Sequence, residues 1–113
     1  MFQNNSKYHA KKTTIDGIVF DSKKEALHFC VLRALERKGN VSNLQRQVKF
    51  VLIPSEKGID GKKQREISYY ADFVYYDSDG IRHVQDVKGV KTPVYKLKKR
   101  LLWHVHHINV EEI

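Results

Sequence analysis

The chain has 113 residues, 41% of them hydrophobic, which is enough for one domain with a buried core. Lys and Arg total 21 against 13 Asp and Glu, so the net charge is +8, and a balance this basic predicts a polyanionic partner, most often nucleic acid. A single cysteine excludes an intramolecular disulfide, and the longest apolar run, 50–53, is too short for a membrane span, so we expect a cytoplasmic protein.

The N-terminal residues 1–12 contain three lysines and no acid, which predicts a flexible basic arm before a single domain over residues 13–113. Two short β runs follow within residues 13–20. They flank Asp16-Gly17, a favourable two-residue turn, and therefore predict a β-hairpin.

A helix is predicted over residues 23–38. Ser22 fits its N-cap, and Glu25, three residues later, completes a capping-box pattern. Apolar residues at helical spacing predict its buried face, namely Leu27, Cys30, Val31, Ala34 and Leu35. Cys30 is therefore expected to be a small core residue and not a nucleophile.

Three strands are predicted next. Residues 44–53 alternate in polarity, and the polar residues 54–66 predict a mobile loop. The core face of the first strand is expected to consist of Val48, Phe50 and Leu52. Residues 67–77 give the strongest strand signal, because aromatic and β-branched side chains dominate them, and a Ser-Asp-Gly turn leads into a strand over 81–88.

A second helix is predicted after Thr92, which can cap it with Pro93 at the first position. Its apolar face is expected to comprise Val94, Leu97, Leu101 and Val105. A short strand at 107–113 closes the chain. The order hairpin, helix, three strands, helix, strand predicts an α/β (α+β) fold with a mixed β-sheet flanked by two helices.

The register of the hairpin around 78–80 decides where two acids lie. A three-residue loop with Gly80 in the left-handed conformation pairs Asp77 with Ile81, and the same register sets Asp72 directly opposite Asp86. A two-residue Asp79-Gly80 loop instead sets Asp72 opposite Val87 and places the two acids on different faces.

In the first register two carboxylates oppose each other, which destabilises a sheet unless a cation lies between them. Mg²⁺ characteristically binds one or two carboxylates and keeps several waters. Lys88 follows Asp86 on the same face, within reach of a phosphate or a metal-bound water. An acid two residues before a lysine occurs four times in the chain, but only at Asp86 does it lie in a strand predicted to pair with another acid-bearing strand.

The order of Glu25 on the first helix, Asp72 in one strand and Asp86-Val87-Lys88 in the next resembles the PD-(D/E)xK nuclease superfamily. From about residue 11 onward, the chain resembles a family of small phage proteins of that superfamily. The segments that carry the resemblance are "KKTTIDGIVFDSKKEA", "SNLQRQVKF", "YYADFVYYD", "QDVKG" and "VYKLKKRLL". Ala71 replaces the proline that names the superfamily, and Asp86 replaces the more common Glu.

The resemblance implies a restriction-endonuclease-like core and a metal-dependent endonuclease that hydrolyses DNA. Asp72 and Asp86 would hold Mg²⁺ or Mn²⁺ with the Val87 carbonyl, and Lys88 would orient the attacking water or stabilise the transition state. Glu25 would orient the site or bind a second metal through water, which competes with its capping-box role.

Further expectations concern DNA and assembly. Basic residues of the second helix predicted to contact the DNA backbone are Lys96, Lys99 and Arg100. Gln45 or Gln47 is a weaker candidate for the site, as is Lys96. Branched or recombination-intermediate DNA is the expected substrate by analogy with small phage resolvases, in the host cytoplasm, and cutting two strands calls for a homodimer. The alternative is a DNA-binding or recombination-accessory protein that keeps the fold without turnover.

Overall fold

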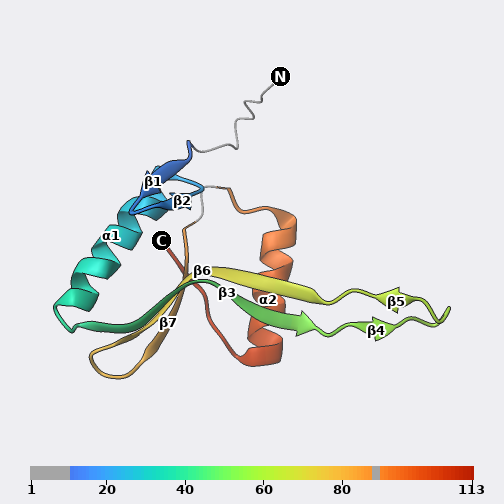
Figure 1. Ribbon diagram of the computed structural model, residues 1–113. Helices are drawn as coiled ribbons and strands as arrows, with labels where there is room; N and C mark the ends of the chain where they lie inside the picture. The colour runs from blue at the N-terminus through green and yellow to red at the C-terminus, as the bar shows by residue number, and fades with distance from the viewer. Residues whose placement is uncertain (1–10, 88–89) are drawn as a thin grey trace, which may run out of the picture.

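The computed structural model describes residues 11–87 and 90–113 and has a mixed α+β fold (Figure 1). Its elements in chain order are β1 (Thr13–Ile15), β2 (Ile18–Phe20), α1 (Lys23–Arg37), β3 (Val41–Ile53), β4 (Glu56–Lys57), β5 (Lys63–Gln64), β6 (Ile67–Asp77), β7 (Arg82–Asp86), α2 (Pro93–His106) and β8 (Glu111–Glu112). The main sheet has the order β3-β6-β7-β8 and is mixed, because β7 and β8 are parallel whereas the other neighbours are antiparallel. The predicted class is confirmed at this level. The predicted arm, residues 1–12, lies almost wholly outside the described residues.

The first hairpin forms as predicted. Ile15 pairs with Ile18, so Asp16-Gly17 is the two-residue loop between β1 and β2. Both loop residues have positive φ, 52° for Asp16 and 77° for Gly17, which is the backbone twist that a tight hairpin turn requires.

Helix α1 begins at the predicted cap, since the Ser22 Oγ accepts a hydrogen bond from the Glu25 N–H at 3.0 Å. The predicted apolar face is largely wrong. Leu27 and Val31 are more than half exposed and Cys30 is exposed, whereas the buried residues are Glu25, Ala26, Phe29 and Leu32. Apolar residues occupy two adjoining faces of this helix, and the packing of Phe29 against Phe20 and Phe73 determines which face turns inward.

Helix α2 also has its predicted cap, with the Thr92 Oγ accepting from the Tyr95 N–H at 3.1 Å. Its predicted apolar face is wrong in the same way: Val94, Leu97 and Val105 are exposed, and only Leu101 is partly buried against the core. Tyr95 and Leu102 face the sheet instead. Periodicity groups the four predicted residues on one side of the helix, but Tyr95 and Leu102 lie on another side, and their packing decides its rotation.

Residues 54–66 are not the irregular loop that their polarity predicted. They contain strands β4 and β5, paired with Lys57 opposite Lys63, and form a narrow hairpin that prolongs β3 and β6 (Figure 1). The turn is closed by the Gly58 N–H, which donates to the Lys62 carbonyl at 2.8 Å, and by the Asp60 carboxylate, which accepts from the Lys62 N–H. Local hydrogen bonds thus supply the order that a hydrophobic pattern did not signal.

The β6–β7 turn has the predicted three-residue loop. The Asp77 N–H donates to the Ile81 carbonyl at 2.9 Å, and Gly80 is left-handed with φ of 78°. Pairing continues through Tyr75 with His83 and Phe73 with Gln85. Strand β6 has its predicted bounds, β3 starts three residues early at Val41, and β7 spans only Arg82–Asp86.

The long β3–β6 pair changes faces in its middle. Ala71 and Phe73 lie in different hydrophobic clusters, although residues two apart in a regular strand share a face. On β3 the same break separates Arg46, whose guanidinium lies over Phe20, from Val48 in the other cluster. Because Arg46 pairs with Phe73 and Val48 with Ala71, the break falls at Gln47, where φ is +50°, and at Asp72.

The break produces two cores, one on each face of the sheet. One cluster contains Tyr95 and Leu102 of α2, and the other contains Ala26, Phe29 and Leu32 of α1. Figure 1 shows the two helices lying over different halves of the β3–β6 pair. Gln47 and Asp72 therefore lie where the cluster under α1 ends and the cluster under α2 begins.

The inward face of α2 is testable with two leucines. We expect Leu102→Ala to reduce the free energy of unfolding by about 2–5 kcal/mol, because Leu102 is fully buried and its removal leaves a cavity. Leu97→Ala, at a position 60% exposed on the same helix, should change it by no more than about 0.5 kcal/mol. Urea unfolding followed by circular dichroism measures both. Equal losses would mean that the predicted face, and not the observed one, packs on the sheet.

Candidate functional site

Asp72 and Asp86 form the centre of the site. The pairing of β6 with β7 ends at Phe73 and Gln85, and Asp72 and Asp86 are the next residues along the two strands. Each carboxylate also binds the neighbouring strand: the Asp86 Oδ1 accepts from the Asp72 N–H at 3.0 Å, and the Asp72 Oδ2 accepts from the Val87 N–H at 2.9 Å. Asp86 is fully buried and Asp72 partly exposed, so solvent reaches the pair from the Asp72 side.

Glu25 joins this pair from α1. Its carboxylate is buried and accepts a hydrogen bond from the Gln47 Nε2 at 3.4 Å. The same Gln47 Nε2 donates to the Asp72 Oδ1 at 3.0 Å, so one amide bridges the two acids. Three predicted site residues from separate elements, Glu25, Asp72 and Asp86, are therefore brought together.

Gln47 is held by an unusual backbone. A φ of +50° is uncommon for a residue with a side chain, and here it coincides with the break in strand alternation. Of the two glutamines weighed from the sequence, the structure selects Gln47. Gln45 lies two residues before Gln47 and pairs with Val74.

The two expectations for Glu25 are compatible. Its backbone N–H donates to the Ser22 Oγ, so the residue takes part in the helix cap. Its carboxylate points instead toward Gln47 and toward Arg46, whose Nη2 lies 3.7 Å from the Glu25 Oε2. The cap therefore fixes the start of α1, and the side chain remains directed at Asp72.

Burial raises the pKa of Glu25 above its ordinary value of 4.5, and the charge of Asp72 raises it further, while Arg46 opposes the shift. The folded protein therefore holds a proton at Glu25 more tightly than the unfolded chain does. The stabilising contribution of the protonated form is complete below pH 4.5 and is lost as the pH rises through the folded-state pKa. Ionised Glu25 is thus an unfavourable group retained beside Asp72.

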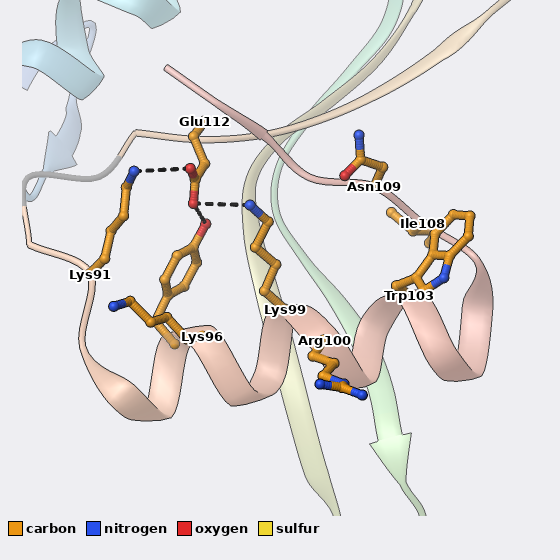
Figure 2. Close-up of a pocket in the computed structure, with 9 residues that line it drawn as sticks. Lys91, Lys96, Lys99, Arg100, Trp103, Ile108, Asn109 and Glu112 are labelled. Atoms are coloured by element: carbon orange, nitrogen blue, oxygen red, sulfur yellow. Dashed lines mark hydrogen bonds and ion pairs between the residues drawn. The ribbon is translucent and has the colours of Figure 1, made fainter.

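The predicted DNA-contacting residues lie elsewhere on α2. Lys96, Lys99 and Arg100 line an open pocket of about 410 Å³ between α2 and the C-terminal segment (Figure 2). The other residues around it are Lys91, Tyr95, Trp103, Ile108, Asn109 and Glu112. Lys96, a weaker candidate for the acid site, therefore lines the basic pocket. The side chain that bridges Glu25 and Asp72 is Gln47, and Arg46 contacts Glu25.

Glu112 organises the pocket and was not foreseen from the sequence. It accepts from the Tyr95 hydroxyl at 2.7 Å, with Lys91 Nζ at 3.1 Å and Lys99 Nζ at 3.2 Å. These partners, Tyr95 first, lower the pKa of Glu112 to about 2. Burial and Glu112 in turn raise the pKa of Tyr95. Its position depends on the pairing of β8 with β7, and no local sequence pattern indicates that pairing.

The basic pocket adjoins the acid pair through the sheet. Glu112 is the parallel partner of Asp86, and the Ile113 N–H donates to the Asp86 carbonyl at 2.8 Å. The charges of Asp86 and Asp72 contribute to the raised pKa of Tyr95, which lines the pocket. One strand spacing, about 4.8 Å, therefore separates the backbone of Asp86 from that of Glu112 in the wall of the pocket.

The donor set is one that suits a hard cation. Across residues 11–87 and 90–113, no three His, Cys, Asp or Glu side chains converge as metal ligands. The carboxylates of Asp72 and Asp86 nonetheless supply oxygen ligands, and Mg²⁺ requires only one or two of these. Lys88, the fourth predicted catalytic residue, lies outside the described residues.

Comparison with known proteins identifies the family. The chain belongs to the family described as protein of unknown function (DUF1064), whose match spans residues 5–112. No curated protein and no solved structure shows significant similarity to the chain. Neither α1 nor α2, the helices of the described part of the chain, has the length and apolarity needed to cross a bilayer.

The raised pKa of Glu25 predicts a stabilising substitution. Glu25→Gln removes the charge but keeps the shape and an oxygen for Arg46 and Gln47, so at about pH 8 it should stabilise the protein by about 0.5–1 kcal/mol. The gain should shrink as the pH falls toward about 5, because the wild-type carboxyl becomes protonated. Glu36→Gln, on the same helix at a partly exposed pair with Arg33, serves as the control and should lose no more than about 0.5 kcal/mol.

Thermal unfolding of both variants between about pH 5 and pH 8 measures these changes. A Glu25→Gln protein less stable than the wild type at the upper pH would show that the Arg46 ion pair outweighs burial.

Proposed function

We propose that this protein is a metal-dependent DNA endonuclease of the PD-(D/E)xK type, with a restriction-endonuclease-like core. The observation that carries the proposal is the meeting of Asp72 and Asp86 on neighbouring strands, where each carboxylate accepts a backbone hydrogen bond from the other strand, with Glu25 linked to Asp72 through Gln47. This is the arrangement of acids that the sequence resemblance requires.

The energetics of the site favour a functional origin for the acids. Two opposed carboxylates and a buried glutamate cost stability in a sheet, and Arg46 is the basic side chain that contacts Glu25. An apolar row would pack better at a position between two hydrophobic cores. A chain that keeps this arrangement uses the carboxylates for a cation or for chemistry.

Asp72 and Asp86 are the residues that would hold Mg²⁺ or Mn²⁺, with the Val87 carbonyl as a further ligand. The cation, when bound, would lower the pKa of a water and neutralise charge on the phosphate. The chain itself orients the ligands: the Val87 N–H fixes the Asp72 Oδ2, and Gln47 fixes the Oδ1. Substrate would enter from the exposed side of Asp72.

Lys88 and Glu25 complete the proposed machinery. Lys88 follows Asp86 by two residues, and we assign it to the attacking water or to charge in the transition state. Glu25, whose pKa is raised by burial and by the charge of Asp72, is suited to exchange a proton at a higher pH than an ordinary glutamate or to orient a second cation through water.

DNA is the proposed substrate because the chain carries a charge of +8 and has a basic pocket next to the strand of Asp86. Branched or recombination-intermediate DNA is proposed by analogy with small phage resolvases. A homodimer would supply the two sites needed to cut two strands. The alternative function, a DNA-binding or recombination-accessory protein without turnover, accounts for the basic surface but gives no role to the opposed acids.

A cleavage assay separates the two functions. We expect the protein to cut at least one of linear, nicked, flapped and four-way DNA in Mg²⁺ or Mn²⁺, and none in EDTA. Asp72→Asn should abolish cleavage, whereas Asp79→Asn, the same change in the exposed β6–β7 turn, should leave it intact. Binding of these DNAs without cleavage in either metal would favour the accessory protein.

Metal binding can be measured without DNA. Calorimetric titration with Mn²⁺ should show a site that is lost in Asp72→Asn and in Asp86→Asn and retained in Asp79→Asn. Circular dichroism checks the fold of the Asp86 variant, because that residue is fully buried. Wild-type binding in Asp72→Asn, where the side chain is partly exposed, would remove the metal site from this position.

Lys88→Ala tests the last role. A group that acts in the transition state affects rate more than binding, so cleavage should fall by about 10²–10³-fold while DNA affinity changes little. Single-turnover cleavage and fluorescence anisotropy give the two values. A parallel fall in affinity would make Lys88 a phosphate contact only.

A further inference from the structure

We infer that the basic pocket on α2 binds one unpaired DNA nucleotide, with its base stacked on Trp103 and its phosphate held by Lys96 and Arg100. The inference rests on the proposed function and specifies its substrate: DNA with a single-stranded segment beside the position of cleavage. Three properties of the pocket support the inference: its shape, its positive charge and its place next to the strand that carries Asp86.

The pocket combines an aromatic surface with cations. Trp103 is 55% exposed at one end of the pocket, next to Asn109, and its ring makes an edge-on contact with His107 at 5.3 Å (Figure 2). That contact restrains the ring, and more than half of the residue stays exposed to solvent. Exposed tryptophan beside positive charge is the usual platform for stacking an unpaired base, and Asn109 offers an amide for its polar edge.

The pocket carries a net positive charge, and only some of its cationic side chains are in ion pairs within the described residues. Four cationic side chains line it against one carboxylate, Glu112. Glu112 holds two of them, Lys91 and Lys99, at 3.1 and 3.2 Å. Among the described residues, Lys96 and Arg100 have no ion-pair partner, so both remain available for phosphate.

An unpaired nucleotide fits this pocket better than duplex DNA does. In a duplex both faces of each base are covered by its neighbours, so a protein ring can stack on a base only when that base is extruded or single-stranded. A volume of about 410 Å³ is within the range of small-ligand pockets, and the pocket is open on one side for the connecting backbone.

Placement links the pocket to the proposed chemistry. Glu112 forms part of the pocket and pairs with Asp86 across β7 and β8. A strand seated on Trp103 and Lys96 would pass Glu112 at the Lys96 end of the pocket, and Glu112 is the β8 neighbour of Asp86 (Figure 2). The pocket would select flaps, gaps or branch points by requiring an unpaired nucleotide at that place.

The test uses Trp103 itself, which is the only tryptophan in the sequence. A short single-stranded DNA should quench its fluorescence to saturation in wild-type protein kept in EDTA. An equally long deoxyribose-phosphate backbone without bases should bind about tenfold more weakly or worse, and a blunt duplex of the same length likewise. Because no metal is present, the result does not depend on cleavage.

Paired variants test the assignment of residues. Lys96→Ala/Arg100→Ala should weaken single-strand binding by about tenfold, whereas Lys62→Ala/Arg65→Ala, an equal charge change on the exposed β4–β5 hairpin, should leave it within about twofold. By anisotropy with labelled DNA, Trp103→Phe should retain binding and Trp103→Ala should lose about tenfold.

Three results would overturn the inference: equal affinity for the base-free backbone, equal losses in the two double variants, or tighter binding of RNA than of DNA. Failure of the proposed function gives a different result. In that case the quenching and the variant pattern persist, while no DNA structure is cleaved in Mg²⁺ or Mn²⁺.

Discussion

The pairing of β6 with β7 is the constraint on which the rest of the site depends. The Asp77 N–H bond to the Ile81 carbonyl and the left-handed Gly80 fix a three-residue loop, and the register that follows brings Asp72 and Asp86 to neighbouring positions, where each carboxylate binds the other strand. A shift of one residue in the register of β7 against β6 would turn Asp86 to the other face of the sheet and separate it from Asp72. A turn some distance along the hairpin thus determines which charges meet.

A second constraint is the break at Gln47 and Asp72. Strands that kept one alternation would present one apolar face throughout, whereas this break gives each helix its own cluster on opposite faces. It also leaves Asp72 between Glu25, reached through Gln47, and Asp86 on the next strand. The positive φ of Gln47 is therefore best understood as part of the site, because strain of this kind persists where the surrounding structure requires it.

The acidic row and the basic pocket belong to one arrangement. Strand β8 joins them, since Glu112 pairs with Asp86 and also holds Lys91 and Lys99. The Tyr95 hydroxyl and the two lysines lower the pKa of Glu112 to about 2, so Glu112 keeps its charge and its hold on Lys91 and Lys99 even in mildly acidic solution. Opposite charges placed this close together would suit the proposed nuclease, which has to attract phosphate while it holds a cation.

Local sequence determined the features that local chemistry controls. The caps at Ser22 and Thr92, the Asp16-Gly17 turn and the Gly80 loop are all encoded within a few residues, and the last of these predicted the β6–β7 register that the structure has as far as Phe73 and Gln85. The inward faces of both helices were not predictable, because each has apolar residues on more than one side and only packing chooses between them. The bridging role of Gln47 and the place of Glu112 beside Asp86 depend on a strand break and on a parallel pairing between distant segments, so only the tertiary structure decided them.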